Sequence, residues 1–217
     1  MTKIIYKQYD KKLISTLPVV SFPGRIVTVF SPGETRLAVN YLLSQGILGV
    51  DTETRPSFKK GYQHTVSLLQ VSSREVCFLF RLNFIGMPPD IIRFLEDTTV
   101  PKIGLSWHDD VLSLKKRCDF TPGLFIDLQE HVGEIGIEDL SLQKIFANLF
   151  GQKITKKEQL SNWENQVLTD KQKLYAATDA WACIKIYDEL MRLKASGDYE
   201  LIDNNTYEIQ DSLPEER

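Results

Sequence analysis

The sequence has few cysteines and no long apolar run, and each shortage excludes a class of protein. Cys77, Cys118 and Cys183 are an odd number of thiols with no Cys-x-x-Cys pair. This pattern argues against a disulfide framework or a zinc site and favours reduced thiols in a cytoplasmic protein. The longest uncharged stretch, Leu37–Val50, is too short and too polar to cross a bilayer. Charges scattered through the first residues predict no signal or transit peptide, so we expect a cytoplasmic protein with no membrane contact.

An excess of basic residues is also missing. The net charge is −3 and the pI is near 5.7, whereas domains that bind nucleic acid along its length are usually basic. An enzyme that holds only the end of a strand needs no more than a local basic rim, and bound divalent cations would offset several acidic charges. The composition therefore disfavours a general nucleic-acid-binding module but leaves an end-acting enzyme open.

Apolar segments bounded by turn residues predict a mixed sheet. Three expected strands follow one another with no room for a helix between them, so they must be antiparallel. Later strands alternate with helices, which implies parallel crossovers. The expected strands are Arg25–Phe30, Ile47–Thr52, Thr65–Ser72, Glu75–Leu82, Pro101–Ser106 and Leu124–Leu128. The fold class is therefore α/β: three antiparallel strands at the start, a parallel continuation, and helices on both faces.

Helices are expected between and after these strands, and one domain holds them all. The predicted helices are Glu34–Ser44, Asp90–Glu96, Asp109–Lys116, Leu140–Phe150 and a long one that starts at the capping residues Thr169 and Asp170 and runs to about Leu193. Residues 1–194 form the expected domain. Residues 195–217 are acidic and polar, which predicts a flexible C-terminal tail.

Two carboxylates end an apolar strand. Asp51 and Glu53 follow Ile47–Val50, and the alternation of side chains along a strand puts both on the same side. Buried carboxylates are costly unless a positive charge compensates them. The other Asp-x-Glu triplet, Asp198 to Glu200, lies in a polar segment and is read as a solvated pair.

Further acidic residues occupy comparable places. Asp109 or Asp110 lies where a strand leads into a helix, and its alternative role is a helix cap. Tyr175 and Asp179 are four residues apart and share one face of the long helix, with small alanines beside them. An ordinary buried tyrosine–aspartate hydrogen bond is the alternative there. Together these acids would form a like-charge cluster that only cations stabilise, and oxygen-only ligands favour Mg²⁺ or Mn²⁺.

The order of these residues resembles a known family. Asp51-x-Glu53, then Asp110, then Tyr175-x-x-x-Asp179 is similar to the DEDDy 3′-5′ exonucleases, the group of ribonuclease D and the Werner helicase exonuclease domain. The blocks LPVVSFPGRIVTVF, GVDTE, VSLLQVS, KIGLSWHDD, LSNW and LTDKQKLYAATDA carry the resemblance from about Leu17 to Leu193. The sister subgroup would have histidine at Leu174, so the tyrosine form is indicated.

The resemblance implies a ribonuclease H-like fold and hydrolysis of phosphodiester bonds with two divalent metal ions, Mg²⁺ or Mn²⁺. Asp51, Glu53 and Asp179 would hold one ion, and Asp51 with Asp110, through water, the other. Tyr175 is a poor base at neutral pH, so it would orient the attacking water. Counting from Lys102 and Gly104, which match a family Lys-x-Gly, selects Asp110 over Asp109. The products would be 5′-mononucleotides.

The substrate would be nucleic acid with a free 3′ end, DNA favoured over RNA, and a helicase partner, if any, would be a separate chain. The candidate substrate-binding residues are Thr52, Tyr62, His108, Lys156 and Trp163. Trp163 could stack on a base or anchor its segment in the core. Three alternatives remain open: an inactive relative that binds nucleic acid or serves as a scaffold, ribonuclease D-like processing of RNA 3′ ends, and an enzyme acting on small nucleotides.

Overall fold

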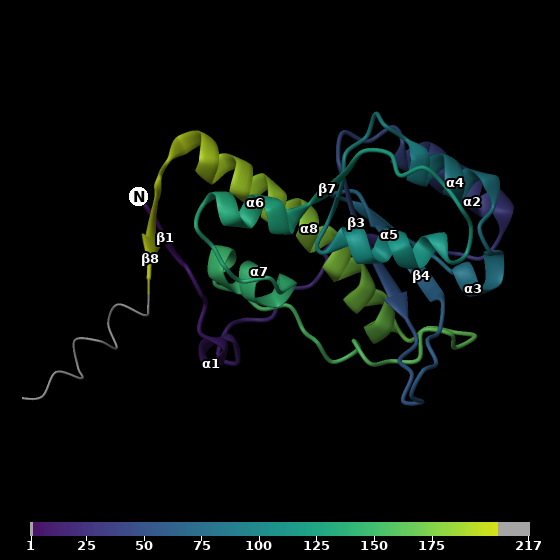
Figure 1. Ribbon diagram of the computed structural model, residues 1–217, viewed down its shortest axis with the longest axis horizontal. Helices are drawn as coiled ribbons and strands as arrows, with labels where there is room; N and C mark the ends of the chain where they lie inside the picture. The colour runs from purple at the N-terminus through teal and green to yellow at the C-terminus, as the bar shows by residue number, and fades with distance from the viewer. Residues whose placement is uncertain (1, 204–217) are drawn as a thin grey trace, which may run out of the picture.

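The computed structural model describes residues 2–203 and centres on a six-stranded mixed sheet (Figure 1). The strands, in spatial order, are β2 (Arg25–Val29), β5 (Val76–Phe80), β4 (Val66–Ser72), β3 (Leu48–Thr54), β6 (Lys102–Gly104) and β7 (Phe125–Asp127). Strands β3, β4 and β5 are antiparallel, and β6 and β7 continue in parallel from β3. This confirms the predicted mixed sheet. The early strand β2 joins the other edge, parallel to β5.

Helices cover both faces of this sheet, as predicted. The helices are α1 (Lys11–Ile14), α2 (Pro32–Leu42), α3 (Leu82–Ile85), α4 (Pro89–Glu96), α5 (Trp107–Lys115), α6 (Leu128–Glu134), α7 (Leu142–Phe150) and α8 (Asp170–Ser196). One core cluster packs Val39 of α2, Phe94 of α4 and Leu114 of α5 against the sheet. Helices α6, α7 and α8 bury their apolar side chains in a separate cluster. None of the helices within residues 2–203 has the length and apolar character to span a membrane.

Helix α8 lies unusually close to the central strand β3. A Cβ added to Gly49 would stand 1.9 Å from the backbone oxygen of Ala180, a separation that no real side chain allows. The helix positions that face the sheet carry small side chains, Ala176, Ala177 and Ala180, and all three are fully buried. A capping box between Thr169 and Gln172 starts the helix, as expected from the sequence. The close approach brings the side chains of α8 to the carboxyl-terminal half of β3.

The end of the described chain differs from the expected tail. Helix α8 continues to Ser196, and β8 (Tyr199–Ile202) pairs in parallel with β1 (Lys3–Tyr6), as Figure 1 shows at one end of the molecule. The side chain of Leu201 packs on Gly136, where no Cβ obstructs it. The expectation of a loose segment is therefore wrong for residues 195–203. Residues 204–217 lie outside the described residues, and the division at residue 194 stays a prediction.

Candidate active site

Three carboxylates from two elements meet beside the centre of the sheet. Asp51 and Glu53 come from β3 and Asp179 from α8, and one oxygen of each lies within 4.8 Å of the others. Glu53 and Asp179 are buried, with 8% and 7% of their surface exposed. The Oδ1 atom of Asp179 is buried and has no hydrogen-bond partner within residues 2–203. An unpartnered carboxylate oxygen among like charges is the environment that a bound cation would stabilise.

The fourth acid of the predicted set stands beside this triad. The hydroxyl of Thr52 donates a hydrogen bond to Oδ1 of Asp110, which lies on the first turn of α5. Asp110 is half-buried whereas Asp109 is exposed. The negative charge of Asp110 helps to raise the pKa of Asp51. The geometry thus favours Asp110 over Asp109, although Asp110 is not within the 4.8 Å triad.

The carboxyl groups hold their protons far more strongly than usual. Burial, with the charges of Asp110 and Asp179, raises the pKa of Asp51 well above its ordinary value. Burial first, and then the neighbouring acids, raise the pKa of Glu53 to about 10. Burial also raises the pKa of Asp110 to about 6 and that of Asp179 to about 7. Hard cations would reverse these shifts, because carboxylate oxygens are the ligands that such ions prefer.

Tyr175 completes the cluster, and a small cavity opens in front of it. Burial, followed by the charges of Asp179 and Glu53, raises the pKa of the Tyr175 phenol, so the hydroxyl stays protonated. A cavity of about 300 Å³ has Tyr175, Asp51 and Lys156 among its lining residues. The exposed ammonium group of Lys156 lowers the pKa of Asp179. The cavity therefore combines acids, a phenolic donor and one exposed positive charge.

The structure treats the expected substrate-binding residues differently. Lys156 and Thr52 line the small cavity, and Tyr62, which is 53% exposed, lines an adjoining one. His108 is exposed and lines a separate cavity with Trp107 and Glu130. Trp163 has 0% exposure and its ring lies 6.0 Å from that of Tyr175. The burial of its ring therefore favours the alternative that Trp163 anchors its segment in the core, beside Tyr175.

Sequence reasoning missed the residue that sets the start of α5. Both oxygens of Asp127, at the end of β7, accept hydrogen bonds from the backbone N–H groups of Ser106 and Trp107, at 3.0 and 2.8 Å. Ser106 is the one non-glycine residue within residues 2–203 with a positive φ, 56°, a strained backbone that surrounding contacts must hold. Asp127 thereby fixes the turn that delivers Asp110. The sequence signal that could have identified Asp127 is its position near the end of the expected strand Leu124–Leu128.

Comparisons with known proteins identify the family of this chain. A family model described as a 3′-5′ exonuclease matches residues 26–194. The chain belongs to the 3′-5′ exonuclease family. It is 31% identical over 191 residues to the bifunctional 3′-5′ exonuclease/ATP-dependent helicase WRN of Mus musculus, covering 83% of this chain and 14% of that protein. It is 28% identical over 146 residues to ribonuclease D of Xanthomonas oryzae, covering 67% of this chain and 40% of that protein.

Solved structures share the fold. The EXO domain of Nibbler from Aedes aegypti aligns with a TM-score of 0.73 and 20% identity over 87% of this chain and 97% of that domain. Ribonuclease D of Escherichia coli aligns with a TM-score of 0.71 and 20% identity over 80% of this chain and 46% of that protein. These likenesses confirm the predicted α/β fold with its mixed sheet; the DEDDy-type family is shown by the family model and the curated relatives. Because the chain spans less than half of the two curated relatives described, their full activities do not transfer to it.

Proposed function

We propose that this chain is a 3′-5′ exonuclease that hydrolyses the terminal phosphodiester bond of nucleic acid, with DNA favoured over RNA. The observation that carries the proposal is the triad of Asp51, Glu53 and Asp179, whose carboxylate oxygens lie within 4.8 Å of one another, with Glu53 and Asp179 buried and Asp51 half-buried. The membership of the exonuclease family supports the direction of attack, from the 3′ end. The products are 5′-mononucleotides and a strand shortened by one residue.

The acids fit divalent cations better than any other partner. Their donor atoms are all oxygens, and Oδ1 of Asp179, which has no hydrogen-bond partner within residues 2–203, could coordinate a cation. Asp51, Glu53 and Asp179 would hold one Mg²⁺ or Mn²⁺, and Asp51 with Asp110 a second. When bound, such ions lower the pKa of a coordinated water and stabilise the charge that develops on the phosphate.

The residues of the chain itself have separate tasks. The Tyr175 hydroxyl, which stays protonated, hydrogen-bonds the attacking water and fixes its direction. The oxygen of that water forms the new bond to phosphorus, and the bond from phosphorus to the 3′ oxygen of the preceding nucleotide breaks. Lys156 is the one basic residue of the small cavity, and its charge suits the reacting phosphate. The ring of Trp163 packs against that of Tyr175 and supports its position.

The direct test is a time course on single-stranded oligonucleotides that carry a label at the 5′ end. With Mg²⁺ or Mn²⁺ we expect a ladder of products that shortens one nucleotide at a time, and no ladder from an Asp51→Asn variant. Wild-type protein that releases nothing from DNA or RNA would leave the inactive, scaffold-like alternative. Faster release from RNA than from DNA would favour ribonuclease D-like processing of RNA 3′ ends, and release only from small nucleotides would support the third alternative.

The relative named as an exonuclease and helicase suggests where a partner would act. That relative is named as both an exonuclease and a helicase, and we propose that a helicase on a separate chain delivers the 3′ end to this one. A pull-down with this chain as bait, in the presence of a forked DNA, tests the association. Recovery of the chain without an ATP-dependent unwinding activity would argue against it.

A further inference from the structure

A second cavity continues the small one away from the triad. Its volume is about 820 Å³, and its lining includes Tyr62, Lys116 and Leu160. The two cavities share the lining residues Glu53 and Gln159, so they adjoin there, and together they are here called the cleft. A strand whose terminal phosphate lies at the triad must leave through an opening of this kind, because its remaining nucleotides need space.

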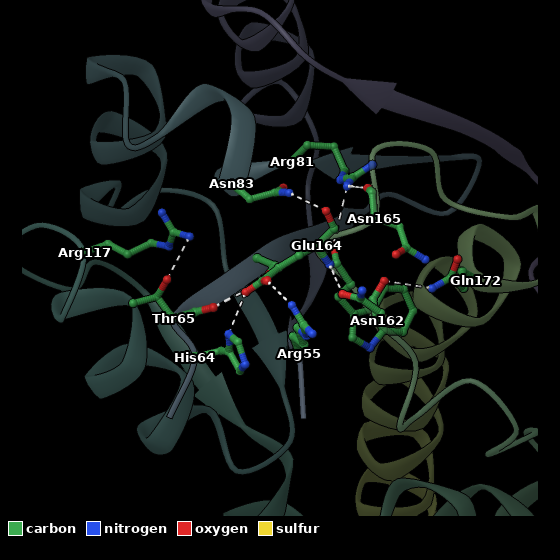
Figure 2. Close-up of polar contacts among 12 residues, drawn as sticks. Arg55, His64, Thr65, Arg81, Asn83, Arg117, Asn162, Glu164, Asn165 and Gln172 are labelled. Atoms are coloured by element: carbon green, nitrogen blue, oxygen red, sulfur yellow. Dashed lines mark hydrogen bonds and ion pairs between the residues drawn. The ribbon is translucent and has the colours of Figure 1, made fainter. Parts of the chain in front are cut away.

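One wall of this cleft is formed by the connection between β3 and β4, residues 55–65, here called the β3–β4 arm. The tip of the arm, Phe58 to Lys60, projects beyond the cavity lining. Both ends of the arm are tied to one carboxylate: Arg55 Nη1 lies 3.1 Å from Glu164 Oε2, and His64 Nδ1 lies 2.9 Å from Glu164 Oε1 (Figure 2). Figure 2 shows these two side chains converging on Glu164 from the arm. The two ends of the arm are therefore held together through Glu164.

The backbone around Glu164 is held in place by contacts with the core. The neighbouring Trp163 is fully buried, and the Asn83 amide donates to the backbone oxygen of Glu164 at 3.4 Å. The buried guanidinium of Arg81 donates to the backbone oxygens of Trp163 and Asn165, on either side of it. These contacts, drawn in Figure 2, hold the segment against the end of the sheet. The position of the arm is thus coupled to the core rather than left to the loop alone.

The tip of the arm presents an aromatic ring and two cations to solvent. Phe58 is 90% exposed. Nearly all of its apolar side chain therefore stays in water, which is unfavourable in free energy. Lys59 and Lys60 follow it, and neither forms an ion pair within residues 2–203. A turn orders this tip, because Tyr62 N donates to Lys59 O at 3.2 Å and Gly61 takes the positive φ, 77°, that the turn needs.

The charge of the arm is opposite to that of the chain. Residues 55–65 contain Arg55, Lys59 and Lys60 and no acidic residue, in a protein of net charge −3. Exposed aromatic rings interleaved with lysines are the composition of surfaces that bind single-stranded nucleic acid, where bases stack on the rings and phosphates meet the cations. Continuity with the triad and complementary charge therefore point to one occupant, the substrate strand.

We propose that the β3–β4 arm binds the single strand upstream of the reacting 3′ end, with Phe58 stacked on a base and Lys59 and Lys60 on phosphates. This inference takes the identity of the ligand from the proposed function. It implies a substrate preference: strands long enough to reach the arm bind more tightly than a dinucleotide, which occupies only the small cavity. It also implies that the strand must be unpaired where it passes Phe58.

The test measures binding without divalent metal, so that hydrolysis does not intervene. Fluorescence anisotropy gives the Kd of a labelled single-stranded DNA of about 12 nucleotides, a length in the range of single-strand binding sites, and of a labelled dinucleotide. We expect Phe58→Ala to weaken binding of the longer strand about fivefold or more, from the loss of one stacked base, and to affect the dinucleotide far less. Phe58→Trp should retain the affinity of the wild type.

The lysines are tested by salt dependence. Lys59→Ala/Lys60→Ala should reduce the slope of log K against log salt by roughly 0.7 for each lost phosphate contact. Two consecutive exposed lysines on α1 supply a matched control. The variant Lys11→Ala/Lys12→Ala should keep the wild-type slope. Leu37→Ala on α2 is the matched control for Phe58, because its side chain is also exposed, at 69%, and lies outside the β3–β4 arm.

The outcomes separate this inference from the proposed function. Ladder formation by wild type with unchanged Kd and salt slope in the arm variants overturns the arm and leaves the exonuclease. Weaker binding by the arm variants without any hydrolysis by wild type keeps the arm and overturns the exonuclease. Failure of wild type to bind either single-stranded DNA or RNA overturns the arm as well. Thermal melting checks that each variant is folded.

Discussion

Replacing Asp179 with asparagine should stabilise the metal-free protein. The pKa of Asp179 rises from 3.8 to about 7, and each unit corresponds to about 1.4 kcal/mol, so ionising this carboxyl in the fold costs on the order of 4 kcal/mol. The asparagine amide is still a buried polar group with unsatisfied atoms, which costs about 1–3 kcal/mol. We therefore expect Asp179→Asn to raise the free energy of unfolding above pH 7 by about 2 kcal/mol, the difference between these two estimates.

The effect has a defined pH window. Because the folded-state pKa is raised, the Asp179 carboxyl contributes proton-linked stability that is complete below pH 3.8 and is lost as the pH rises through about 7. Near pH 4, where Asp179 is protonated in the fold, the variant should therefore be less stable than the wild type by about 1–3 kcal/mol. It should overtake the wild type as the pH rises and keep a constant advantage above pH 7. At pH 8 this advantage corresponds to a rise in Tm of about 4–8 °C for a chain of this size, measured by calorimetry in EDTA.

Divalent metal should reverse the order of the two proteins. At a concentration about 100 times its Kd, a bound cation adds about 2.7 kcal/mol to the wild type, whereas the variant has lost a ligand. Asp188→Asn on the same helix is the matched control: its carboxylate is 39% exposed and pairs with Arg74, so it should change stability by less than about 1 kcal/mol and keep the metal response. A metal-free Asp179→Asn protein that melts at or below the wild type at pH 8 would refute the reasoning.

Four further substitutions test other parts of the site. Tyr175→Phe keeps the packing on the core and should lower kcat about 100-fold or more with little change in KM; unchanged kcat contradicts the water-orienting role. Asp110→Asn should lower kcat by roughly 100-fold, and Asp109→Asn by less than about twofold, as two parallel kinetic assays would show. Gly49→Ala forces a Cβ against the backbone of Ala180, so we expect a loss of about 1–3 kcal/mol or more in urea unfolding and weaker metal binding.

Local patterns carried most of the architecture. Turn residues and apolar runs placed β3, β4 and β5, and their short connections required the antiparallel arrangement that the structure has. Side-chain alternation put Asp51 and Glu53 on one side of β3, and helical spacing put Tyr175 and Asp179 on one face of α8. Those two periodicities fixed which acids could meet, since each depends only on neighbours in the chain.

Long-range packing was not predictable in the same way. The pairing of β1 with β8 joins Lys3 to Tyr199, and no local signal ties segments so far apart in the chain. The complete burial of Trp163 depends on Arg81 and Tyr175, which come from other elements. The role of Asp127 likewise depends on β7 lying beside β6. In each case the deciding contact joins residues whose proximity only the finished topology creates.

The site therefore lowers the stability of the metal-free protein, and packing of the surrounding core must offset this loss. Strand β4, the neighbour of β3, is buried at all seven positions, and the alanines of α8 close the other side, so the acids of β3 cannot relax into solvent. A flexible surface would let Glu53 and Asp179 move apart and hydrate, and their pKa values would return toward normal. Rigid burial instead keeps three carboxylates within reach of the same small ion. The same packing that destabilises the metal-free acids is what prepares them to bind metal without reorganisation.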